Sequence, residues 1–347
     1  MFPSGADEEK RTMMSKRLRG AVALLACLVL GACGSATATP DRPVYTWDMT
    51  VTVGESSTWY QAAERFAETL SRESGGRMEL RIFTGEQLSA GDPAAGVEQL
   101  MNGDKDFSYN STIIYAGIDP RFGAINAPFL YRGYDEADRA LDGGATAAYE
   151  KLSSEIGVKM LGFGESGFRQ LTNNVRSVSK PADLSGIKVR IPGIGMFTDI
   201  FRSLGANPTT MNFSEVFTSL QQGTIEGQEN PMDVISSAGL AEVQRHLTVW
   251  NYVYDPLILG MNQDLFRSLS PEDRKIVQKA AADANSFQIE TNRGLEQQQI
   301  DEQSKLMTTT ELTDAQVARF RAAVRPLYES YEPVWGPAMV RAVSPER

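Results

Sequence analysis

Residues 183–231 constrain the fold of this chain more than any other segment. Apolar and charged residues alternate over 187–191, as in a β-strand, and the apolar residues that follow recur every three or four positions, as in a helix. The complete pattern predicts strands at 187–191, 209–211 and 224–228, and helices at about 196–204 and 212–222. Short strands joined through helices run parallel, because antiparallel neighbours need only a turn. The segment therefore predicts a parallel α/β sheet.

Three side chains follow the ends of these expected strands. Arg190 lies at the end of the first strand, Phe213 follows the second and Asn230 follows the third. Open parallel sheets bind ligands beyond the carboxyl ends of their strands, so a cation, an aromatic ring and an amide converge on one rim. The same residues also suit ordinary roles, as a surface strand residue, a core residue and a turn former before Pro231. Residue types alone leave both interpretations open.

The N-terminal half shows the same alternation of strands and helices. The pattern predicts strands at about 45–53, 78–83 and 106–109, and helices at 58–73 and 93–102. Each half can therefore build its own sheet, and the chain is expected to hold two α/β halves.

The segments between and after these halves predict the connections. A helix is expected at 135–156, a strand that crosses between domains at 158–163, a helix at 239–247 and a returning strand at 248–259. Ser270, followed by a proline, is a strong helix start, and the helical pattern continues to about residue 307. A helix of that length, roughly 55 Å, is longer than either domain and must bridge both or kink.

Four motifs in 183–231 occur in a specific order: KVRIP (188–192), LGANP (204–208), FSEV (213–216) and GQENP (227–231). In order and spacing they resemble the DctP-type solute receptors of tripartite ATP-independent periplasmic (TRAP) transporters. The resemblance extends over about 45–307. It implies an α/β, two-domain fold like that of periplasmic binding proteins, with a ligand cleft between two lobes and a long helix that bridges both.

The resemblance also implies a ligand site. Arg190 matches the family arginine that pairs with the substrate carboxylate, and a guanidinium suits a carboxylate in geometry and stays charged. Asn230 matches the amide beside it, and Phe213 matches the aromatic residue that packs on the ligand. Arg169, in GFRQ (167–170), matches a second family arginine, although one additional residue separates it from Arg190 here.

Four further residues are expected near the pocket from their places in the chain: Thr52, Asn110, Trp250 and Asp255. Residues at such places are more often core or turn residues. If Asp255 faces the cleft, its carboxylate would favour a hydroxyl or an amine on the ligand. The choice between acids is expected to depend on the lobe opposite Arg190.

The expected domain organisation places two lobes after an N-terminal signal. Lobe I comprises 45–165 and about 256–295, and lobe II comprises 166–255 and about 296–325. The remaining segments are a lipoprotein signal at 1–33, a linker at 34–44 and a C-terminal tail or packing helix at 326–347.

The N-terminus has the features of a secretory signal. Three basic residues within 16–19 precede the apolar run 21–30, which is too short to span a bilayer. The ending LGAC resembles a bacterial lipoprotein signal, in which Cys33 carries the lipid; the alternative is a plain signal-peptidase site with a chance cysteine. Acidic residues at 7–9 do not suit such a signal, so Met13 or Met14 is a candidate start.

Charge and composition exclude several kinds of chemistry. The chain has 34 Lys and Arg against 44 Asp and Glu, a formal net charge of −10, which argues against nucleic acid as a partner. Its two cysteines lie within the first 33 residues and its one histidine is His246, so neither a metal site, a cofactor site nor a Ser/His/Asp site is expected. The loop Gly193–Ile194–Gly195 lacks the third glycine of a dinucleotide-binding motif.

The sequence therefore predicts a lipid-anchored extracytoplasmic receptor without enzymatic activity. It would capture a small carboxylate and deliver it to the membrane subunits of a TRAP transporter. One alternative is the binding protein of an ATP-driven (ABC) importer, which shares the two-lobed plan; the order of the Arg190 and Asn230 motifs and the long helix argue against it. The other is a secreted surface hydrolase, against which the shortage of His and Cys counts.

Overall fold

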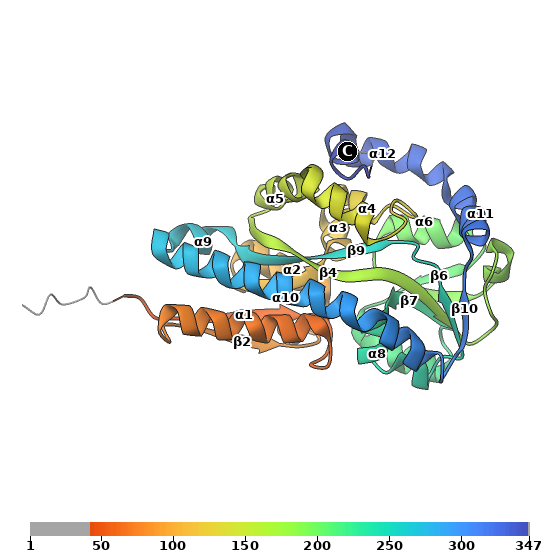
Figure 1. The fold of residues 1–347 in the computed structure, drawn as a ribbon, viewed down its shortest axis with the longest axis horizontal. Coiled ribbons are helices and arrows are strands. Elements are labelled where there is room, and N and C mark those ends of the chain that lie inside the picture. The colour runs from red at the N-terminus through yellow and green to blue at the C-terminus, as the bar shows by residue number, and fades with distance from the viewer. Residues whose placement is uncertain (1–41, 346–347) are drawn as a thin grey trace, which may run out of the picture. The chain divides into compact units, whose positions relative to one another are not determined.

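The computed structural model describes residues 42–345 (Figure 1). The expected signal 1–33 with Cys33, and most of the linker 34–44, lie outside the described residues. Within the described range, no helix combines the length and the apolar character needed to cross a membrane.

The described strands join in one ten-stranded mixed sheet, whose main path runs β2-β1-β3-β9-β4-β7-β5-β6, with β8 and β10 branching from β4. The strands are β1 (Tyr45–Val51), β2 (Met78–Phe83), β3 (Phe107–Ser111), β4 (Val158–Asn173), β5 (Lys188–Ile191), β6 (Asn207–Thr210), β7 (Gly227–Pro231), β8 (His246–Val249), β9 (Tyr254–Asn262) and β10 (Thr308–Glu311).

The two predicted α/β halves are present. In the first, β1 pairs in parallel with β2 and β3. In the second, β5 pairs in parallel with β6 and β7, as the 183–231 pattern predicted. The helices of these halves are α1 (Thr58–Ser74), α2 (Pro93–Asn102), α3 (Thr112–Ile118), α6 (Gly195–Ser203), α7 (Val216–Gln222) and α8 (Met232–Ser237).

Two long strands connect the halves. The first part of β4 pairs with β9, and its last part pairs with β7 and β8. The predicted crossing strand 158–163 therefore continues much further than expected, to Asn173. The register between β4 and β9 shifts between Glu165 and Gly167, where the strand passes from one half to the other.

The long helix expected after Ser270 is confirmed. Helix α10 (Pro271–Gln303) has 33 residues, and the Ser270 hydroxyl accepts a hydrogen bond from the Asp273 backbone N–H at 3.1 Å. It packs against α1, β4 and α8, and Figure 1 shows it running diagonally across both halves of the sheet. Short helix α9 (Gln263–Ser268) precedes it, and α11 (Asp314–Val324) and α12 (Pro326–Ala342) follow β10.

Two local predictions are wrong in detail. The helix expected at 135–156 is broken into α4 (Tyr134–Ala140) and α5 (Thr146–Glu155), because Gly144 between them has a φ of 136°. The segment 239–247 forms one short turn, Leu240–Glu242, and then enters strand β8.

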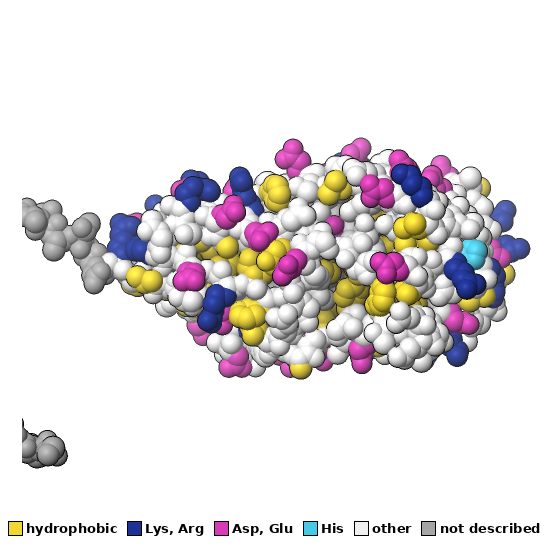
Figure 2. Space-filling view, turned by 90° about the horizontal axis from the view of Figure 1, so that it is seen from below, with side chains coloured by type: hydrophobic (Ala, Val, Ile, Leu, Met, Phe, Trp, Pro, Cys, Tyr) yellow, Lys and Arg dark blue, Asp and Glu magenta, His cyan; other side chains and the backbone are white. Residues whose placement is uncertain are grey.

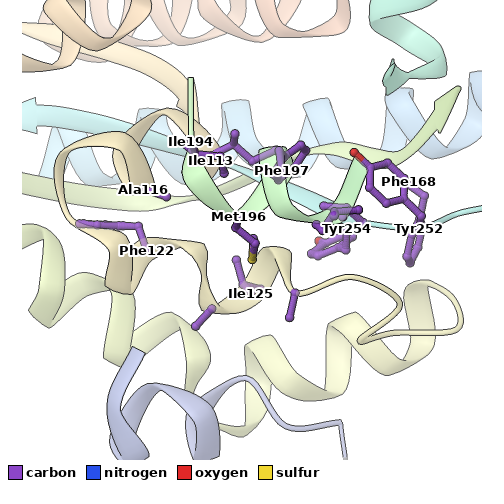
Figure 3. Packing of buried hydrophobic residues seen from close by; sticks show 14 of the residues in the cluster. Ile113, Ala116, Phe122, Ile125, Phe168, Ile194, Met196, Phe197, Tyr252 and Tyr254 are labelled. Atoms are coloured by element: carbon purple, nitrogen blue, oxygen red, sulfur yellow. The ribbon is translucent and has the colours of Figure 1, made fainter. Parts of the chain in front are cut away.

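The largest apolar core joins the second half to the helices that cover it. Figure 3 shows Ile113, Phe197, Phe168, Tyr252 and Tyr254 in this core. The rings of Phe168 and Tyr254 lie 5.4 Å apart and those of Phe197 and Tyr252 lie 6.1 Å apart, which are favourable edge and tilted contacts. Strand β4 is therefore packed against strand β9, and helix α6 against the segment just before β9.

Candidate functional site

A pocket lies where the carboxyl ends of the parallel strands of both halves meet. Its walls come from residues at or after the ends of β1 and β3 in the first half, and of β5, β6 and β7 in the second. The cavity volume is about 50 Å³, well below the range for small-molecule sites, roughly 300–1,000 Å³, so the pocket is nearly closed in this structure.

The structure brings together most of the predicted site. Seven of the eight predicted ligand-site residues line this pocket: Thr52, Asn110, Arg169, Arg190, Phe213, Asn230 and Asp255. They come from segments up to two hundred positions apart in the sequence, and the two halves of the sheet position them.

Trp250, the eighth residue, lies elsewhere. Its ring centroid is 4.6 Å from that of Tyr252 and 5.3 Å from that of Phe320, inside the aromatic core. Its backbone N–H donates to Oε1 of Gln170 at 2.9 Å. Trp250 thus supports the core and does not line the pocket that holds the other seven.

Arg190 ends β5 with its guanidinium buried at the pocket wall. Its Nε and Nη2 donate to the backbone carbonyl of Met211 at 3.0 and 2.8 Å. Among residues 42–345 no carboxylate lies within salt-bridge distance of it, and burial lowers the pKa of Arg190 to about 10. Arg190 is therefore a buried cation at neutral pH that forms no ion pair within the described chain, although the charge of nearby Glu229 partly opposes the effect of burial on its pKa.

Phe213 and Asn230 flank this cation. The Arg190 guanidinium carbon lies 5.9 Å from the centroid of the Phe213 ring, within reach of a cation–π interaction. Asn230, at the end of β7, donates from Nδ2 to Gln228 Oε1 at 2.6 Å and accepts at Oδ1 from Arg169 at 2.9 Å. The amide is thus fixed in one orientation, with one Nδ2 hydrogen left for a second acceptor.

Arg169 differs from Arg190 because two carboxylates already hold it. Its guanidinium contacts Glu229 through Nε and Nη2, and its Nη1 lies 2.6 Å from Oδ2 of Asp255. Burial opposes the charge of Arg169, but Glu229 and Asp255 raise its pKa above the usual arginine value. Asp255 also accepts from the Ser111 hydroxyl at 2.5 Å. Arg169 of β4 therefore links β7, through Glu229, and β9, through Asp255, at the pocket wall.

A second buried network supports the wall on the side of β1 and β3. Nδ2 of Asn110 donates to Oε1 of Glu86 at 3.0 Å, and the Thr52 hydroxyl lies 3.1 Å from the same oxygen and 3.0 Å from Asn110 Oδ1. Nζ of Lys105 lies 3.6 Å from the other Glu86 oxygen and donates to Thr50 Oγ1 at 2.5 Å. Burial lowers the pKa of Lys105 although Glu86 opposes that shift.

The sequence did not predict that Glu86, Lys105 and Trp59 lie in or behind the pocket wall. Trp59, which is 4% exposed, lines the pocket from α1, and its indole N–H has no hydrogen-bond partner in the described structure. Charged residues in the turn after β2 and before β3 resemble ordinary surface residues, so no local pattern marks Glu86 or Lys105. The sequence feature that relates to Glu86 is the glycine at position 96, within helix α2. The structure explains this glycine, because a Cβ at Gly96 would lie 2.4 Å from Glu86 Oε2.

The arrangement suits binding better than catalysis. Across residues 42–345, no group of three or more His, Cys, Asp or Glu side chains is placed to hold a metal ion. The pocket instead presents a fixed cation, an oriented amide and an aromatic ring on one wall. Two α/β halves around one such pocket have the arrangement of a protein that binds a small molecule between two domains.

The chain belongs to one family of such proteins. It matches the model of the DctP family, "Bacterial extracellular solute-binding protein, family 7", over residues 49–333. This family comprises the solute receptors of TRAP transporters, which are periplasmic binding proteins and not enzymes.

Three known proteins illustrate the similarity. The 2,3-diketo-L-gulonate-binding periplasmic protein YiaO of Escherichia coli is 33% identical over 65% of this chain and 69% of its own length. A TRAP periplasmic solute-binding protein of Ralstonia eutropha with bound (S)-2-acetolactate has a TM-score of 0.84 and 30% identity, covering 86% of this chain and 98% of its own. The sugar acid-binding protein DctPAm of Advenella mimigardefordensis, in complex with galactonate, has a TM-score of 0.83 and 30% identity, covering 87% and 97%.

Proposed function

We propose that this protein is an extracytoplasmic receptor that binds one small organic acid and delivers it to the membrane subunits of a TRAP transporter. The Arg190 guanidinium pairs with the ligand carboxylate, Asn230 donates to it, and Phe213 packs on the ligand. The observation that carries the proposal is the buried charge of Arg190, which forms no ion pair with a carboxylate within the described chain. Related receptors whose solved structures hold acetolactate or galactonate support an acidic ligand.

Arg169 acts in this proposal as a positioning residue. Its three contacts, with Glu229, Asp255 and Asn230, fix the Asn230 amide beside Arg190. Thr52, Asn110 and Asp255 form the opposite wall, where their bonds to Glu86, Ser111 and each other hold them in place. Each oxygen of Asp255 accepts one hydrogen bond, from Ser111 or Arg169, which fixes the orientation of this carboxylate in the wall.

The two lobes of the receptor are 45–165 with about 256–295, and 166–255 with about 296–325; the C-terminal segment 326–347 packs on them. Strand pairing supports this division, because β1, β2, β3 and residues 256–262 of β9 lie on one side of the β4 register shift. Strands β5, β6, β7 and β8 lie on the other side, with Tyr254 and Asp255 of β9. The Thr58 backbone N–H of α1 donates to the Asp233 carboxylate of α8 at 3.2 Å, a contact that joins the lobes beside the pocket.

A lipid on Cys33 anchors the receptor to the cell membrane. The apolar run and LGAC ending of the sequence support this part of the proposal. Mass spectrometry of the membrane fraction should find diacylglycerol on an N-terminal Cys33, and Cys33→Ser should release the protein from that fraction. An unmodified N-terminus at another residue would exclude the anchor.

A panel of acids tests the binding function. Dicarboxylates, 2-oxo acids, aldonic acids, uronic acids and amino acids are added to the purified protein, and the melting temperature is followed. At least one acid should raise the melting temperature of the parent and of the control Arg202→Gln, whose arginine is exposed on α6, but not that of Arg190→Gln. Equal shifts in both variants would contradict the role of Arg190.

A further inference from the structure

The charged side chains around the pocket can neutralise a single carboxylate on the ligand. Two other cations lie in or behind its walls, and each is already paired: Arg169 with Glu229 and Asp255, and Lys105 with Glu86. Arg190 remains as the unpaired cation within the described part of the chain. A second carboxylate on the ligand would be buried without a counter-ion and close to Asp255 and Glu86, which carry like charge.

Most polar groups of the opposite wall are also paired. Asn110 uses one Nδ2 hydrogen for Glu86 and its Oδ1 for Thr52 and the Ser111 backbone N–H, which leaves one Nδ2 hydrogen. Ser111 donates to Asp255. A ligand with many hydroxyl groups would have to break these bonds to satisfy its own, so the wall does not suit a polyhydroxylated acid.

The rest of the lining is apolar. Six buried or half-buried hydrophobic residues from both halves complete the pocket: Val53, Pro93, Ile113, Ile114, Pro192 and Val234. Branched and ring-shaped side chains of this kind pack favourably against methyl groups and offer hydroxyl groups no hydrogen-bond partner. The body of the ligand is therefore expected to be apolar and compact.

Besides the remaining Nδ2 hydrogens of Asn110 and Asn230, the indole N–H of Trp59 in the lining has no partner among the described residues. This N–H is buried, and the side chain itself is 4% exposed. A buried donor without an acceptor costs free energy, and an oxygen on the bound ligand would remove that cost.

We propose that the ligand is a small monocarboxylic acid with a short branched apolar body and one carbonyl or hydroxyl oxygen that accepts from Trp59. This assignment rests on the proposed function, because it takes the Arg190–carboxylate pair as given. Trp59 is then a specificity-determining residue: it selects the oxygen-bearing acid over the plain branched acid. The charge balance excludes dicarboxylates, and the occupied wall excludes sugar acids.

Titration calorimetry on the purified full chain tests the ligand class with defined probes. The branched probes are 3-methyl-2-oxobutanoate, 2-hydroxy-3-methylbutanoate and 3-methylbutanoate, and the contrasting probes are succinate and galactonate. We expect one of the two oxygen-bearing branched acids to bind at least about tenfold more tightly than 3-methylbutanoate, succinate and galactonate. Tighter binding of succinate or galactonate that is lost in Arg190→Gln would overturn this inference and leave the carboxylate pair standing.

The role of Trp59 is tested with Trp59→Phe, which keeps an aromatic ring and removes the N–H. It should weaken binding of the oxygen-bearing acid about five- to thirtyfold and change that of 3-methylbutanoate less than twofold. Trp250→Phe is the matched control, because it removes another buried unpaired indole N–H outside this pocket. Equal affinities of the parent and Trp59→Phe for every acid would overturn the assignment, and no binding of any acid by the parent would remove both this inference and the proposed function.

Discussion

The buried charge of Arg190 lowers the stability of the ligand-free protein and is available to bind the ligand. Folding buries its guanidinium beside a backbone carbonyl and a ring, and within residues 42–345 it gains no carboxylate in return. Arg169 is buried to the same degree but is neutralised by Glu229 and Asp255. The pKa values follow the difference: that of Arg190 is lowered to about 10, and that of Arg169 is raised. The ligand carboxylate would supply the counter-ion that Arg190 lacks.

Replacing Arg190 should therefore stabilise the ligand-free protein. Arg190→Met removes a buried unpaired charge and keeps an unbranched side chain, so the free energy of unfolding should rise by about 1–3 kcal/mol. Chemical denaturation without ligand measures this change. Arg202→Met, at an exposed position, should stay within about 0.5 kcal/mol of the parent. A clear loss of stability in Arg190→Met would show that the charge is compensated in the free protein.

The pH dependence of affinity follows from the same pKa. A bound carboxylate favours the charged form of Arg190, so affinity is complete while Arg190 is protonated and is lost as the pH rises through its free-state pKa of about 10. Affinity should be constant from about pH 7 to 9 and fall towards tenfold per unit above 10. Titration at each pH, with circular dichroism to confirm folding, checks this. An affinity that stays constant up to pH 11 would contradict it.

At the scale of elements, the crossing strand β4 depends on small residues that let helix α10 and strand β3 approach it. Gln288 of α10 accepts from the Glu165 backbone N–H at 2.7 Å and donates to its carbonyl at 2.7 Å, which satisfies both backbone groups beside the register shift. At Gly164 an added Cβ would lie 1.6 Å from the Tyr109 hydroxyl. Glycine is thus required where the strand passes between the halves.

Two glycine-to-alanine substitutions distinguish the close approach at Gly164 from the general effect of replacing a glycine within a helix. Gly164→Ala should destabilise the protein by about 1–3 kcal/mol or more, because the strand or Tyr109 must move. Gly294→Ala, in α10 with no atom within 4 Å of the added Cβ, should stabilise it by about 0.5–1 kcal/mol. Thermal or urea unfolding measures both. Similar effects of the two substitutions would refute the close approach at Gly164.

At the scale of the whole molecule, local patterns predicted the fold far better than the remote contacts of the site. Alternation and helical spacing found the parallel strands and α10, because these depend on neighbours in sequence. They failed at 135–156 and 239–247, where a glycine conformation and pairing with distant β4 and β10 decided the outcome. Trp59, Glu86 and Lys105 could not be predicted, because their roles arise only when separate segments meet.

The central claim is that Arg190 pairs with the ligand carboxylate, and a double-mutant cycle tests it most directly. The dissociation constants of the best-binding acid and of its uncharged amide are measured by calorimetry for the parent and for Arg190→Gln. The pair should show a coupling free energy of at least about 1.5 kcal/mol, so that amidation weakens binding strongly in the parent and little in the variant. A coupling near zero, with both proteins preferring the acid to the amide by the same factor, would contradict the account.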